Sequence, residues 1–161
     1  MPSLVDNRHL IFSFDPGLVT GWACLDPNTG GFVSGQTEGR HAFYRQFESM
    51  IATGVKAEVV GEKYVITART AQLTAQYDAL FILGHIDALS DKLGFPLTLQ
   101  TPAAAKAFST DSKLRAVGWY TPSKGGHSND AARHLLLYVS SRKQLLAGKP
   151  LLNKIVEALG L

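Results

Sequence analysis

Four polar residues of this 161-residue chain have types and positions that could do chemistry together. Asp15 and Glu62 each end a short apolar run, and His127 and Asp130 open a helical pattern. Residues three apart project from the same side of a helix, so His127 and Asp130 would face one way. Three carboxylates and one imidazole form an oxygen-rich set that suits Mg²⁺ or Mn²⁺, whereas zinc sites use Cys and several His. The sequence therefore predicts a divalent metal site, provided that the fold brings these residues together.

Simpler explanations exist for the two strand-end carboxylates. A Pro-Gly pair follows Asp15, and an Asp-Pro-Gly turn would explain that residue without a site. Glu62 would fit equally as an exposed residue at a strand end. In favour of a site, residues 10–15 are apolar on both faces, which predicts a central strand whose terminal carboxylate is costly to bury unpaired. We expect His134, four residues after Asp130, to support the site or face solvent rather than bind metal directly.

The elements that must position these residues form one predicted α/β domain over residues 1–161. Predicted strands cover residues 10–15, 20–25, 32–37, 57–62 and 97–100. Predicted helices cover residues 40–51, 67–93, a helix capped by Thr101, another capped by Ser109 or Thr110, one from Ser128 to about Ala147, and 151–159. The first three strands are joined by short turns and predict an antiparallel meander. The fourth is reached through a helix, so it should lie parallel to an earlier strand, and sites form at the carboxyl ends of such strands.

The predicted helix over residues 67–93 carries more apolar surface than one core-facing stripe needs. The surplus lies at Leu80, Phe81, Leu83 and Ile86. We interpret it as a homodimer interface formed by a second copy of the chain. The alternative is a helix that is buried deep in its own domain.

Charge divides the chain into two unequal parts. The net charge is +3, yet residues 92–161 carry +7 and residues 1–91 carry −4. A basic half of this kind suggests a polyanionic partner, although a solvated basic face would also explain it. No apolar run reaches the length of a membrane span, residues 1–9 contain no signal-peptide core, and the single Cys24 cannot form an internal disulfide. We therefore expect a cytoplasmic protein without membrane contact.

The element order and the carboxylate positions resemble the RuvC family of Holliday junction resolvases, in particular small phage-type members. The residues that carry the resemblance are Asp15 in Asp-Pro-Gly-x-x-x-Gly, Glu62, and the pair His127 and Asp130. It implies a ribonuclease H-like fold, in which helices cover both faces of a mixed five-stranded sheet. It further implies that these four residues bind two Mg²⁺ or Mn²⁺ ions, and that a homodimer nicks opposed strands of a four-way junction. The expected products carry 5′-phosphate and 3′-hydroxyl ends, and no small-molecule cofactor is expected.

The resemblance also implies residues that contact DNA. Lys106 and Lys113 match the positions of two phosphate-contacting lysines between the fifth strand and the last long helix. Tyr64 is the nearest match to an aromatic residue that follows the catalytic Glu in the family, although its register differs. Lys124 lies in a Gly-rich loop that could close over a DNA strand. Trp119 of the same loop could contact DNA or belong to the core.

Three other functions fit parts of the pattern. The same site could belong to a less selective nuclease that cuts forks, flaps or replication intermediates. A catalytically idle junction-binding protein is a second alternative, but a binder gains nothing from carboxylates that face phosphate. A nucleotide-binding module of the related actin-like fold would need a duplicated half and Gly-rich phosphate loops, which this sequence lacks.

Overall fold

The sheet at the centre of the molecule has five strands, and the first three form the predicted meander. The computed structural model describes residues 8–51, 55–69, 71 and 76–160. The strands are β1 (His9–Asp15), β2 (Val19–Leu25), β3 (Phe32–Glu38), β4 (Lys56–Glu62) and β5 (Leu97–Gln100). Their order is β3-β2-β1-β4-β5, with β2 antiparallel to β1 and β3, and β4 parallel to β1 and β5. The carboxyl ends of β1 and β4 therefore lie side by side, which brings the chain after Phe14 next to the chain after Gly61.

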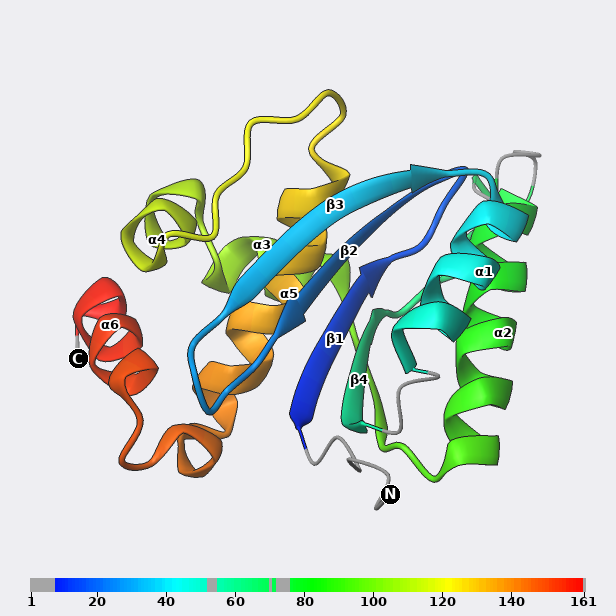
Figure 1. The fold of residues 1–161 in the computed structure, drawn as a ribbon. Coiled ribbons are helices and arrows are strands. Elements are labelled where there is room, and N and C mark those ends of the chain that lie inside the picture. The colour runs from blue at the N-terminus through cyan, green and yellow to red at the C-terminus, as the bar shows by residue number, and fades with distance from the viewer. Residues whose placement is uncertain (1–7, 52–54, 70, 72–75, 161) are drawn as a thin grey trace, which may run out of the picture.

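Helices cover both faces of this sheet (Figure 1). On one face lie α1 (Arg40–Ile51) and α2 (Gln76–Leu93). On the other lies α5 (His127–Ser141), with α3 (Pro102–Phe108), α4 (Asp111–Val117), the 3₁₀ helix η2 (Lys143–Leu146) and α6 (Pro150–Leu159) beyond it. The predicted caps are confirmed for the two short helices, because the hydroxyls of Thr101 and Thr110 accept backbone hydrogen bonds at the starts of α3 and α4.

The side chains of β1 alternate between two cores, as expected for a strand covered on both sides. Phe12 and Phe14 pack with Phe43 and Phe47 of α1 in one core. Ile11 packs on the opposite side with residues of α5. β1 therefore lies between two cores, and Asp15, which ends it, is half-buried.

Three predicted boundaries, on two helices, are wrong. Residues 63–69 form no helix, and α2 begins at Gln76, so the helix predicted over residues 67–93 is too long at its start; residues 70 and 72–75 lie outside the described residues. The β-branched run Val65, Ile66 and Thr67 disfavours helix, which agrees with this later start. Ser128 lies inside α5 rather than at its N-cap, and α5 ends at Ser141 before η2 begins.

The predicted dimer surface on α2 also needs correction. Ile86 is fully buried in the core of its own chain and cannot meet a second copy, because it lies on the helix face that packs against the sheet. Leu83 is half-buried beside β4. Leu80 and Phe81 are 40% and 54% exposed, so the surplus apolar surface is real but narrower than predicted. No helix within the described ranges is long and apolar enough to cross a membrane.

Candidate active site

The first part of the candidate site is a contact between the end of β1 and the start of α5. Asp15 ends β1, and its Oδ2 lies 3.0 Å from Nδ1 of His127. Gly21 of β2 pairs with Asp15 and permits this contact. A Cβ at Gly21 would lie 1.9 Å from the backbone oxygen of His127, so a larger residue would push α5 off the sheet. The second glycine of the Asp-Pro-Gly-x-x-x-Gly motif thus has a structural reason, which is the close approach of the helix.

Further hydrogen bonds fix the first turn of α5. The backbone N–H of His127 donates to Oε1 of Gln36 at 3.0 Å, and Nε2 of Gln36 donates to the carbonyl of Lys124 at 3.0 Å. One side chain of β3 therefore satisfies a free helix donor and holds the preceding loop. The side chain of Asn129 holds Thr121 of the same loop through both its backbone N–H and its carbonyl. Sequence reasoning missed Gln36 and Asn129, because these contacts join distant parts of the chain.

The second part of the site is Glu62, which ends β4 beside Asp15. Its Oε2 lies 3.1 Å from Nε2 of His134, and Nδ1 of that ring lies 3.0 Å from Oε1 of Gln100 at the end of β5. His134 is 1% exposed, so the expectation that it faces solvent is excluded and a supporting position remains. Gln100 was not identified from the sequence, although its place at a neighbouring strand end was a usable signal.

The third part is Asp130, whose two carboxylate oxygens each form a salt bridge with a basic side chain. Lys106 of α3 places Nζ 3.5 Å from Oδ2, and Arg133 places Nη1 3.2 Å from Oδ1. Arg133 also pairs with Asp111 of α4 and so links α4 to α5. Lys106 is 58% exposed at its side chain and is free to turn toward a ligand, whereas Arg133 is 16% exposed and is held in place. Arg133 was missed in the sequence, although its spacing of three from Asp130 predicts the contact.

The charges of Glu62 and Asp130 act on Asp15. Burial is the main cause that raises the pKa of Asp15 to about 6; the charge of Glu62 and then that of Asp130 contribute in the same direction, whereas the hydrogen bond from His127 lowers it. A buried group that is disfavoured as an anion by two neighbouring anions needs a positive partner. The structure therefore places Asp15 in contact with His127 and within electrostatic range of Glu62 and Asp130.

The donor set fits a hard divalent cation, although the side chains do not form a closed cage. In the part of the chain that the structure describes, no group of three or more His, Cys, Asp or Glu side chains is arranged as a ready metal site. Magnesium keeps several waters and binds through one or two carboxylates together with substrate phosphates. An open group of half-buried carboxylates, with an exposed lysine at its edge, suits that mode of binding.

The other predicted DNA contacts lie around this centre or away from it. Lys124 lines a hollow of about 500 Å³ beside His127. Lys113 donates from Nζ to the carbonyl of Phe108 at 2.7 Å, so one donor of its ammonium group is engaged within the domain. Tyr64 is half-buried just after β4. Trp119 is 2% exposed and stacks on Phe32, so it belongs to the core.

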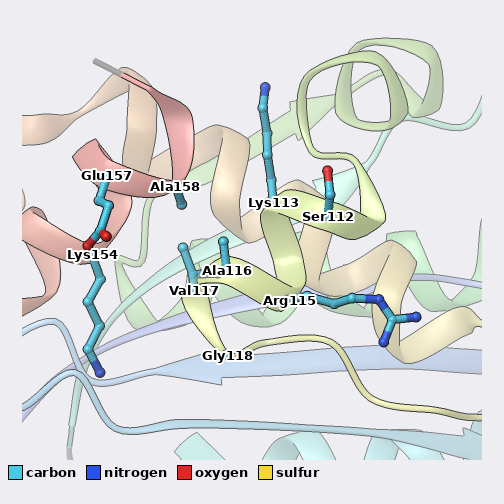
Figure 2. A pocket seen from close by; sticks show the side chains of 9 residues that line it. All are labelled: Ser112, Lys113, Arg115, Ala116, Val117, Gly118, Lys154, Glu157 and Ala158. Atoms are coloured by element: carbon cyan, nitrogen blue, oxygen red, sulfur yellow. The ribbon is translucent and has the colours of Figure 1, made fainter.

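A larger pocket of about 770 Å³ lies between α4 and α6 (Figure 2). Lys113, Arg115 and Lys154 line it, but Figure 2 shows their charged ends pointing in different directions. The guanidinium of Arg115 lies 3.5 Å from the centre of the Tyr120 ring. Because its cations diverge, this pocket does not form a cradle for one anion, and the carboxylate group remains the candidate site.

Comparison with solved structures supports the predicted fold. No protein-family model matches the sequence, and no curated protein matches it. The solved structure of Thermus thermophilus RuvC in complex with Holliday junction substrate superposes with a TM-score of 0.65 at 13% identity, covering 86% of this chain and 98% of that chain. A second Thermus thermophilus RuvC structure gives a TM-score of 0.64 at 13% identity, covering 84% of this chain and 96% of that chain. The predicted fold is confirmed: a RuvC-like, ribonuclease H-like mixed sheet with helices on both faces.

Proposed function

We propose that the chain is a RuvC-like endonuclease that resolves four-way DNA junctions by metal-dependent phosphodiester hydrolysis. One observation carries the proposal: Asp15 contacts His127 and lies within electrostatic range of Glu62 and Asp130, so that two strand ends and one helix start contribute to one group of charges. Half-buried carboxylates that repel one another lower the stability of the fold unless cations neutralise them. The likeness to a RuvC structure that holds Holliday junction substrate supports the choice of substrate.

The proposed roles follow from the contacts of each residue. Asp15, Glu62 and Asp130 would hold two Mg²⁺ or Mn²⁺ ions together with His127. Two such metal ions, when bound, would activate a water molecule and stabilise the leaving 3′-oxygen. Hydrolysis would then leave 5′-phosphate and 3′-hydroxyl ends. His127 keeps the Asp15 carboxylate oriented in the absence of metal.

The positive groups at the rim would serve the DNA backbone. Lys106 is the best placed, because its exposed ammonium already lies at the edge of the carboxylate group. When a phosphate arrives, Lys106 can leave Asp130 and neutralise the backbone, while Arg133 keeps Asp130 in position. Lys124 would contact the DNA backbone near His127, along the hollow that both residues line. Lys113 and Tyr64 are weaker candidates for direct contact.

We also propose that the active form is a homodimer. The exposed side chains of Tyr77, Leu80 and Phe81 on α2 form an apolar surface that a second copy would cover. A four-way junction offers two strands related by a twofold axis, and an isologous dimer would present two sites in matching orientation.

The experiment that tests the function is a cleavage assay on defined substrates. Mobile and fixed four-way junctions, a fork, a flap and plain duplex are each incubated with Mg²⁺, Mn²⁺ or EDTA. We expect paired incisions in the junctions with either metal and none in EDTA. Equal cutting of forks and flaps would favour the less selective nuclease instead. Tight junction binding without any incision would identify an idle junction-binding protein and overturn the proposal.

A further inference from the structure

His134 occupies a position where the helix would otherwise be apolar. Its neighbours on the buried side of α5, among them Leu135, Leu136 and Val139, are fully buried hydrophobic residues. His134 is 1% exposed, and both of its ring nitrogens face polar atoms, namely Oε2 of Glu62 and Oε1 of Gln100. Burying an imidazole costs free energy that a leucine would not. The benefit must therefore come from what the ring contacts.

We propose that His134 is a positioning residue that fixes the carboxylate of Glu62 for binding a divalent metal ion. This inference rests on the proposed function, since it gives Glu62 a ligand's role. Nε2 must carry a hydrogen to donate to Oε2 of Glu62, and a neutral ring then accepts at Nδ1 from the Gln100 side chain once the oxygen and nitrogen of that amide are exchanged. With Oε2 engaged in this way, Oε1 is the oxygen left for a cation.

The position of His134 on α5 explains why this contact is useful. Asp130 lies one helical turn before His134, so both side chains project from the same side of one rigid element. Asp130 would bind the metal directly, and His134 would set Glu62 across from it. A glutamate side chain loses rotamer freedom when it binds an ion, and an existing hydrogen bond removes part of that cost in advance. Residues that orient metal ligands in this way typically change metal affinity about 10–100-fold when they are lost.

The test compares two amide substitutions that differ in reach. His134→Gln places its amide nitrogen near the position of Nε2 and can still donate to Glu62. His134→Asn is equally polar, but it is one methylene shorter and reaches only toward Gln100. The unmodified 161-residue chain and both variants are titrated with Mn²⁺ alone by calorimetry, without DNA. Junction binding in EDTA and circular dichroism serve as controls, because a general structural defect would change them too.

We expect His134→Asn to weaken Mn²⁺ binding about 10–100-fold and His134→Gln to stay within about threefold of the unmodified protein. His134→Met, which fills similar volume without a donor, should behave like His134→Asn and serves if that variant does not fold. Unchanged Mn²⁺ affinity in a folded Asn or Met variant would overturn the positioning role alone. Failure of the unmodified protein to bind Mn²⁺ would instead overturn the metal site, and this inference with it.

Discussion

Replacing Asp15 with Asn should stabilise the metal-free protein while it abolishes cleavage. The change removes one negative charge from a half-buried group of three and keeps the shape of the side chain. Asn can still hydrogen-bond to His127, whose Nδ1 lies 3.0 Å from the present carboxylate. A residue that served only the fold would lose stability on this substitution, so the sign of the effect separates the two explanations.

The magnitude follows from the pKa of Asp15, which burial and then the charges of Glu62 and Asp130 raise from 3.8 to about 6. One pKa unit corresponds to about 1.4 kcal/mol, so holding the ionised carboxylate at pH 8 costs the metal-free fold about 3 kcal/mol. The folded state binds the proton more tightly than the unfolded state. The stability gained by protonation is therefore fully present below pH 3.8 and is lost as the pH rises through about 6.

The assay is urea unfolding in EDTA at pH 8 and at lower pH, for the unmodified protein and for Asp15→Asn. We expect the variant to be more stable at pH 8 by about 1–3 kcal/mol, because Asn retains part of the cost of burying a polar group. The advantage should shrink as the pH falls below about 6, since the carboxylate of the unmodified protein is then neutral too. Mg²⁺ should stabilise the unmodified protein but not the variant.

Asp87→Asn is the matched control, because Asp87 is exposed on α2 and the same change there should leave stability nearly unchanged. Junction binding by Asp15→Asn in EDTA should be equal to or tighter than that of the unmodified protein, since less negative charge faces the phosphates. If Asp15→Asn is less stable at pH 8, or cleaves at a normal rate, then the carboxylates do not repel one another as argued and the site is assigned wrongly.

Three further predictions address the helix contact, the DNA contact and the dimer. Gly21→Ala should lower stability by about 1–3 kcal/mol and reduce cleavage, because its Cβ would meet the backbone of His127. Gly84→Ala is the control: it has open space around it and should stabilise α2 by about 0.5–1 kcal/mol. Urea unfolding and the junction assay test both variants. Lys106→Ala should weaken junction binding and lower the slope of log K against log salt by about 0.9 for the lost phosphate contact, and an unchanged slope would place Lys106 outside the interface. Phe81→Glu should convert a dimer into a monomer in sedimentation, and supercoiled cruciform DNA should then be nicked rather than linearised; a monomeric unmodified protein at tens of micromolar would remove this interface.

The sequence was informative where local pattern and chain order determine the structure. The alternation in residues 10–15 predicted a strand covered on both sides, and β1 indeed contributes Phe12 and Phe14 to one core and Ile11 to the other. The helix before residues 57–62 predicted a parallel strand, and β4 pairs with β1 in parallel. These two inferences together bring Asp15 next to Glu62, because parallel neighbours end at the same edge of a sheet.

Local pattern failed where the answer depends on which face of an element meets its neighbour. Helical spacing alone assigned both Ile86 and Phe81 to the dimer interface, yet Ile86 is fully buried and Phe81 is 54% exposed. The buried residues Ala79, Ile82 and Ile86 follow spacings of three and four. Helical periodicity could therefore have distinguished the inward face of α2 from its exposed face. The contacts that hold the start of α5 could not have been found in this way. Gln36 lies 91 residues from His127, and only the packed fold brings them together.

The chain contains its own comparison for the question of whether Asp15 is a turn residue. Asp15 and Asp26 both end a strand or follow one directly, and both precede proline. Asp26 is a turn residue, because its Oδ1 accepts the backbone N–H of Asn28 at 2.8 Å and closes a local loop. The carboxylate of Asp15 pairs instead with His127, 112 residues away, in a position where burial and two other carboxylates raise its pKa. A turn needs only the local bond that Asp26 makes, so the long-range contact of Asp15 is the reason to assign it to the site.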